Sequence, residues 1–134
     1  MKKSSMFLLL LSALFLAACA TGPVEIEEGL KPVEYFQRAQ EAAGTRDDYT
    51  TALAYYTAFI EKYPDDIIRV TEAEYEIAFI HYVQGDLETA ESMFRNLLVK
   101  YEKPGSEVLP KWPKVLAEKL LFEIEIEKEQ QANS

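Results

Sequence analysis

The chain has 134 residues, 49% of them hydrophobic and 28% charged, with a net charge of −9 at pH 7. Charges of both signs are interspersed and the apolar content can build a core, which argues against disorder and fits one small domain. The acidic balance excludes nucleic acid as an expected partner, because such a surface repels phosphate backbones. A single cysteine rules out an internal disulfide.

Residues 1–18 have the pattern of a secretory signal peptide. Two lysines precede the apolar run 6–18, which is shorter than the roughly 20 residues that a membrane-spanning helix needs. The run closes with Leu-Ala-Ala, and Cys19 follows Ala18 directly. Small side chains before a cleavage point admit a peptidase, so we expect cleavage between Ala18 and Cys19.

The Leu-Ala-Ala-Cys sequence resembles the lipobox of bacterial lipoproteins. The resemblance implies a diacylglyceryl thioether and an N-acyl group on Cys19, and no other cofactor is expected. Two or more acyl chains anchor a protein stably, and removal of two lysines takes the net charge to about −11, so lipid rather than basic residues would hold the chain. Ala20 replaces the aspartate that retains such proteins in the inner membrane, which favours the periplasmic side of the outer membrane. An ordinary signal peptide or an uncleaved anchor is the alternative.

The mature chain divides into three expected parts. Residues 19–32 contain two prolines and two glycines without helical periodicity, which is typical of a flexible tether after the lipidated cysteine. Residues 33–129 show apolar spacings of three and four and no hairpin signal, which predicts an all-α domain. Residues 130–134 are a polar tail.

Five helices are expected in this domain. The first runs over 33–43 and stops at Gly44, and the second starts after Asp47 and Asp48, either of which can cap it, and ends at 63–64. The third begins at Thr71, which forms a capping box with the glutamate three residues later. Its end is near residue 85. Asp86 caps a fourth helix, which runs to about residue 101, and a fifth over 113–128 has a proline in its first turn.

A repeat links the second and fourth helices. Ala52 aligns with Ala90, 38 positions later, and Tyr56 aligns with Phe94. A small residue followed four positions later by an aromatic one resembles the second helix of a tetratricopeptide repeat, where the small residue permits close packing. The resemblance predicts a short solenoid of two helix pairs plus a C-terminal helix. The lipobox, the short tether and the Phe-Ile-Glu-Lys-Tyr-Pro ending of the second helix also resemble the much longer BamD-type outer-membrane assembly lipoproteins, which act as scaffolds.

The sequence contains few of the residue combinations that catalysis or metal binding requires. His81 is the only histidine, its helical neighbours add no second ligand, and we expect it to pack where the repeat family has tyrosine. There is no glycine-rich phosphate loop. Two acidic series are most simply solvated or capping groups: Glu72, Glu74, Glu76, Glu123, Glu125 and Glu127. We therefore expect neither an enzyme nor a metal site.

An aromatic stripe is the candidate binding surface. Tyr75, Phe79 and Tyr82 are spaced to share one side of the third helix, and in tetratricopeptide proteins the corresponding positions line the groove that receives peptides. The alternative is that the fifth helix or the tether covers them. Trp112 is a second candidate contact, or else it pins its loop to the core. The fifth helix has more apolar surface than one contact needs, so part of it should meet the repeats or a second chain.

The sequence thus favours a non-enzymatic, lipid-anchored scaffold that binds another cell-envelope protein or peptide segment, in outer-membrane protein assembly or envelope maintenance. No small-molecule substrate is evident. The alternatives are a structural or accessory subunit of a larger envelope complex, such as a solute-uptake system, and a self-associating homodimer.

Overall fold

The computed structural model describes residues 22–134, which fold into five α-helices and one short 3-10 turn. The elements are α1 (Pro32–Arg46), α2 (Tyr49–Lys62), α3 (Ile67–Val83), α4 (Leu87–Tyr101), η1 (Ser106–Val108) and α5 (Lys111–Ala132). The described residues contain no strand, so the all-α prediction is confirmed. The expected signal peptide, Ala18 and Cys19 lie outside the described residues.

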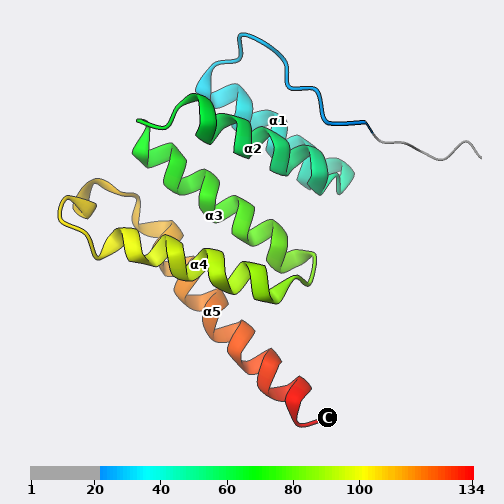
Figure 1. Ribbon diagram of the computed structural model, residues 1–134, viewed down its shortest axis with the longest axis vertical. Helices are drawn as coiled ribbons and strands as arrows, with labels where there is room; N and C mark the ends of the chain where they lie inside the picture. The colour runs from blue at the N-terminus through cyan, green and yellow to red at the C-terminus, as the bar shows by residue number, and fades with distance from the viewer. Residues whose placement is uncertain (1–21) are drawn as a thin grey trace, which may run out of the picture.

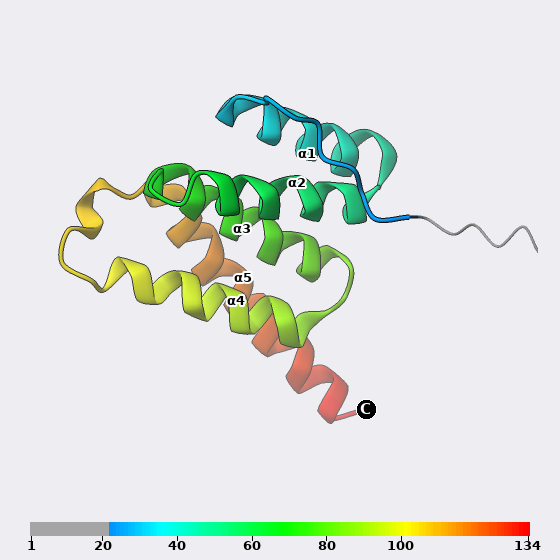
Figure 2. The same cartoon turned by 45° about the horizontal axis from the view of Figure 1, so that its top comes forward.

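The helices form two successive pairs and a final single helix (Figures 1 and 2). α1 packs on α2 and α3 packs on α4, while α2 also contacts α3 and so joins the pairs. α5 packs on α4 and touches α3. The predicted solenoid of two helix pairs plus a C-terminal helix is therefore present, and in both views the C-terminal half of α5 extends beyond the pairs.

Two hydrophobic clusters hold the stack together. The first joins α1, α2 and α3, and the second joins α3, α4 and α5. Ala52 and Ala90 are both fully buried, and Tyr56 and Phe94 fill the space one turn later with exposures of 2% and 0%. The aligned residues therefore pack in the same way in both pairs. The alanine lets two helices approach closely, and the aromatic ring fills the space beside them.

The segment before α1 is partly folded onto the first pair. Leu30 is buried, Ile26 packs against the first cluster, and the Tyr63 hydroxyl donates to the Leu30 carbonyl at 3.0 Å. Arg38 pairs with Glu27 at 3.0 Å. The second half of the segment that we expected to be a tether therefore belongs to the folded unit. A flexible spacer can comprise only the residues before it.

The end of α1 differs from the expectation. The helix passes through Gly44 and stops at Asp47, which takes the left-handed conformation with φ of 51°. Aspartate tolerates this conformation because its short polar side chain bonds locally. Gly44 was therefore wrongly assigned as the stop, and it lies inside the helix.

The start of α3 also differs. The helix begins at Ile67, one turn earlier than predicted, because the Asp66 side chain accepts a hydrogen bond from the Arg69 backbone at 3.2 Å. Thr71 lies inside the helix, 1% exposed, and its hydroxyl donates to the Ile67 carbonyl at 2.7 Å. The predicted capping box at Thr71 was wrong. The caps by Asp48 and Asp86 are confirmed.

α5 keeps the predicted proline in its first turn but continues to Ala132, past the expected end at residue 128. Most of the expected polar tail is therefore helical. The buried side of α5 consists of Pro113, Ala117, Leu120 and Ile124. No helix among the described residues is long and apolar enough to cross a bilayer.

Candidate partner-binding surface

The aromatic stripe of α3 is continuous, but α5 covers one end of it. The ring of Tyr75 stacks on Phe79 at 6.1 Å, and Phe79 stacks on Tyr82 at 6.3 Å. Tyr75 is only 6% exposed, and the Trp112 ring meets it edge-on at 5.0 Å. Burial, with a smaller contribution from Glu76, raises the pKa of the Tyr75 hydroxyl to about 12. Tyr75 is therefore a packing residue in this structure.

Tyr82, at the other end of the stripe, is also held by α5. Its hydroxyl donates to Glu123 Oε2 at 3.2 Å, and burial together with this bond raises the pKa of Tyr82. Glu123 is half-buried, so it is not the solvated group that the sequence suggested. Phe79 is half-buried, as Tyr82 is, and of the three stripe residues it is the one that lines a cavity.

Trp112 fixes the start of α5 on α3. Besides its contact with Tyr75, its indole nitrogen approaches Glu72 Oε1 at 3.4 Å. The residue still exposes 39% of its surface. Of the two roles considered for Trp112, the structure supplies the contacts for the pinning role.

A cavity of about 260 Å³ opens between α1 and α3, next to Phe79. Most of its wall is apolar or aromatic, and two small residues of α1, Ala43 and Gly44, keep it open. A Cβ added to Gly44 would meet no atom within 4 Å. The lining residues are Gln40, Ala43, Gly44, Tyr49, Tyr56, Glu76, Phe79, Ile80 and Val83. Of the three stripe residues, Phe79 lies in the wall of this cavity.

Glu76 is the one carboxylate in the wall of this cavity, and the sequence interpretation missed its role. Burial and the nearby charge of Glu72 raise its pKa, and no hydrogen bond or ion pair of its side chain occurs among residues 22–134. A half-buried carboxylate without a counter-charge is unfavourable, so a cation from outside would be stabilised there. Glu76 precedes Phe79, Ile80 and Val83 by three, four and seven positions. This spacing places the carboxylate on the same side of the helix as these apolar residues, and it could have identified Glu76 from the sequence.

The other two acids of the series are engaged within the chain. Glu74 pairs with Lys100 at 2.6 Å, and Glu72 accepts the weak bond from Trp112. The expectation that all three acids are simply solvated or capping groups was wrong, since each lies half-buried on α3. Of these three glutamates, Glu76 is therefore the one whose carboxylate can pair with a cation from another molecule.

His81 lies at the turn between α3 and α4. Its Nδ1 is 3.2 Å from Asp86 Oδ2. Asp86 also accepts a hydrogen bond from the Thr89 backbone, and these contacts lower the pKa of the Asp86 carboxyl, chiefly through Thr89. Within the described range, no three His, Cys, Asp or Glu side chains gather closely enough to hold a metal ion.

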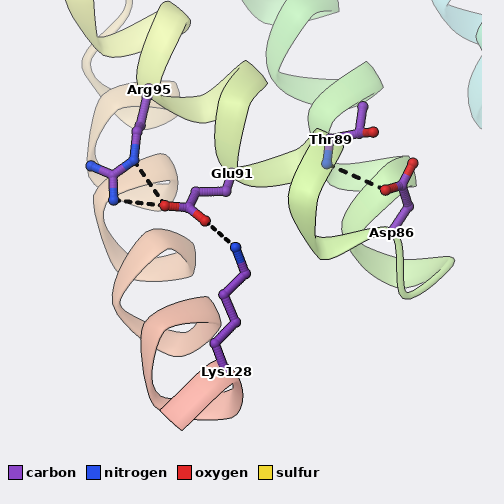
Figure 3. A network of polar contacts seen from close by, with 5 residues as sticks. All are labelled: Asp86, Thr89, Glu91, Arg95 and Lys128. Carbon is purple, nitrogen blue, oxygen red and sulfur yellow. Dashed lines mark hydrogen bonds and ion pairs between the residues drawn. The ribbon is translucent and has the colours of Figure 1, made fainter. Parts of the chain in front are cut away.

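An ion-pair network fixes the C-terminal half of α5 to α4 (Figure 3). Glu91 lies between Arg95 on its own helix, at 2.8 Å, and Lys128 of α5. The hydrogen bonds to Lys128 and then Arg95 lower the pKa of the Glu91 carboxyl. α5 is thus attached to α3 and α4 at three points along its length, Trp112, Glu123 and Lys128.

The comparisons with known proteins agree with this architecture. Residues 34–66, which span α1, α2 and the turn after them, match the family model of the tetratricopeptide repeat. Residues 34–66 thus have the sequence pattern of one tetratricopeptide repeat. The matched segment coincides with the first helix pair, so the structural equivalence of Ala52 and Ala90 makes α3 and α4 a second pair of the same kind.

The chain is also similar to an uncharacterized protein of Treponema pallidum (strain Nichols). The two are 35% identical over 103 residues, which is 75% of this chain and 41% of the relative. The chain thus spans less than half the length of that relative. No solved structure matches the chain.

Proposed function

We propose that this protein is a lipid-anchored scaffold of the cell envelope, and that it binds a segment of another envelope protein in the cavity between α1 and α3. A tetratricopeptide repeat indicates protein binding. The observation that supports this binding site is Glu76. Its carboxylate is half-buried in a mostly apolar and aromatic wall and makes no hydrogen bond or ion pair within residues 22–134.

The chemistry of the cavity defines the segment that fits it. Phe79, Tyr56 and Val83 offer apolar surface, and Glu76 offers a negative charge where water is partly excluded. A lysine or arginine with an apolar neighbour would match both, because a charge pair gains strength away from water. We therefore propose an extended or helical segment with one basic residue entering beside Glu76.

The lipid anchor rests on the sequence of residues 1–19 and places this scaffold at a membrane. Replacing Cys19 with alanine should release the protein from the membrane fraction and remove the incorporation of labelled palmitate. A Cys19→Ala protein that still incorporates the label would contradict lipidation at this residue. The outer membrane is proposed because Ala20 follows the cysteine.

The binding proposal is tested by cross-linking the anchored protein in living cells and identifying what is isolated with it. Glu76→Gln and Phe79→Ala should each lower the yield of the partner about tenfold, while leaving the helical circular dichroism unchanged. The matched controls are Glu125→Gln and Val99→Ala, at exposed sites away from the cavity. Equal yields from all four variants would contradict the proposed site.

A further inference from the structure

α5 carries a second apolar stripe, opposite its buried side. Val115, Phe122 and Ile126 expose 60%, 63% and 39% of their surfaces. At 100° per residue they lie within about 40° of one another around the helix axis. Lys119 falls on the same line between them. A row of apolar side chains on one rigid helix is the mark of an interaction surface rather than of scattered exposure.

The spacing of this stripe fits a helix pair. Residues 115, 119, 122 and 126 are separated by four, three and four positions, which is the seam of a two-helix coiled coil. α5 has 22 residues and is about 33 Å long, so it can bury such a seam along most of its length. No helix in residues 22–134 packs on this side.

The charged residues beside the stripe indicate which kind of helix can pack against it. Of the four charged residues over 111–119, three are lysines, and of the five over 123–129, four are glutamates. The single lysine of the second group, Lys128, is already paired with Glu91. A second copy of α5 in the opposite direction would bring each basic half onto an acidic half, whereas a parallel copy would bring like charges together.

One register satisfies both the apolar and the charged positions. With a two-fold axis level with residues 120 and 121, Val115 faces Ile126 of the second copy and Lys119 faces its Phe122. Lys111 then lies level with Glu129 of the second copy, on the same side of the seam. The aliphatic part of Lys119 can cover the phenyl ring, with its ammonium near the ring face. Every contact occurs twice, as a two-fold interface requires.

We propose that α5 is a self-association surface through which two copies of this chain pair in antiparallel orientation. The surface is separate from the cavity beside Glu76, which leaves both cavities open in the pair. The three anchors of α5 to the rest of the chain hold the stripe in place before pairing, so association needs little reordering.

The oligomeric state of residues 22–134 is the first test, since this range holds both hydrophobic clusters in full. Light scattering across a concentration series should give a mass approaching that of two chains. Phe122→Ser should weaken the association about 100-fold with an unchanged circular dichroism spectrum. A protein that stays monomeric up to about millimolar concentration, or a Phe122→Ser variant that associates as well as the unmodified chain, would overturn the proposal.

Charge exchange tests the register. Lys111→Glu and Glu129→Lys should each weaken the pair about tenfold, because each creates two like-charge contacts. The double variant should restore it, since it exchanges the two charges. Single variants without effect, or a double variant weaker than both, would contradict the register.

Engineered disulfides test the orientation. Residues 22–134 contain no cysteine, so Val115→Cys combined with Ile126→Cys should form an interchain disulfide under mild oxidation. Val115→Cys alone should not, because its two copies lie far apart in an antiparallel pair. Efficient cross-linking of the single variant would overturn the antiparallel arrangement. In-cell cross-links from position 122 only to another protein would overturn self-association.

Discussion

α3 adjoins α1 on one side and α5 on the other, and these two junctions are filled differently. Between α3 and α5, the Trp112 ring covers Tyr75, and Glu123 holds Tyr82. Between α1 and α3, Ala43 and Gly44 leave a cavity into which Glu76 brings a charge. The size of a few side chains thus decides which junction is packed and which is open to a partner.

The largest expected effect comes from opening the closed junction. Trp112→Ala removes the ring over Tyr75 and should lower the free energy of unfolding by about 2 kcal/mol, less than for a fully buried tryptophan because 39% of Trp112 is exposed. Urea denaturation followed by circular dichroism measures the change. Val99→Ala, at an exposed site on α4, is the control and should change the free energy of unfolding by less than about 0.5 kcal/mol, as is typical of surface substitutions. Equal losses in both variants would show that Trp112 does not fix α5.

Narrowing the open junction should stabilise the chain. Gly44 lies inside α1, and an added Cβ meets nothing within 4 Å, so Gly44→Ala should raise the free energy of unfolding by about 0.5–1 kcal/mol through helix propensity. Gly29→Ala is the contrasting variant, because Gly29 has φ of 76° and should lose stability on substitution. A loss of stability in Gly44→Ala would mean that the junction is tighter than described.

The charge of Glu76 gives the open junction a pH dependence. Its pKa is raised in the folded protein, so the ionised form destabilises the fold, and this penalty disappears as pH falls through the folded pKa towards the ordinary value of 4.5. Glu76→Gln should therefore raise the melting temperature at pH 7 by a few degrees. The advantage over the unmodified chain should vanish near pH 4. An advantage that is the same at both pH values would contradict an ionisation effect.

The smallest effect is expected at the edge of α5. Lys128→Ala breaks the pair with Glu91 and should cost less than about 1 kcal/mol, because both side chains are partly exposed to solvent. The cost should shrink in 1 M salt. Since the pKa of Glu91 is lowered, the contribution of this pair is present at neutral pH and is lost as pH falls through the folded pKa. A salt-independent cost would indicate that Lys128 acts through packing.

Much of the fold could be predicted from local patterns. The positions of Ala52 and Ala90 revealed the helix pairs, and Asp48 and Asp86 marked two helix starts, because close packing and capping depend on one or two residues. Two helix boundaries were predicted wrongly. The end of α1 was assigned to Gly44 but lies at Asp47, and the start of α3 was assigned to Thr71 but is set by the cap at Asp66.

The site was less predictable because it depends on tertiary contacts. The spacing of Tyr75, Phe79 and Tyr82 correctly puts them on one side of α3, but it does not say that α5 covers Tyr75 and binds the hydroxyl of Tyr82. Glu76 belongs to a row of alternating glutamates in the sequence, and only the position of α1 shows that it faces a cavity.

The proposed function depends most directly on a partner reaching the surface of α3 beside Phe79, which α5 leaves open. A photoreactive phenylalanine analogue can replace Phe79 in the cavity wall or, as a control, Val99 on α4, which is 48% exposed. After irradiation in cells, the analogue at position 79 should give a discrete adduct with another protein that is lost with Glu76→Lys, while position 99 gives none. No adduct from position 79, or the same adduct from both positions, would contradict the binding cavity between α1 and α3.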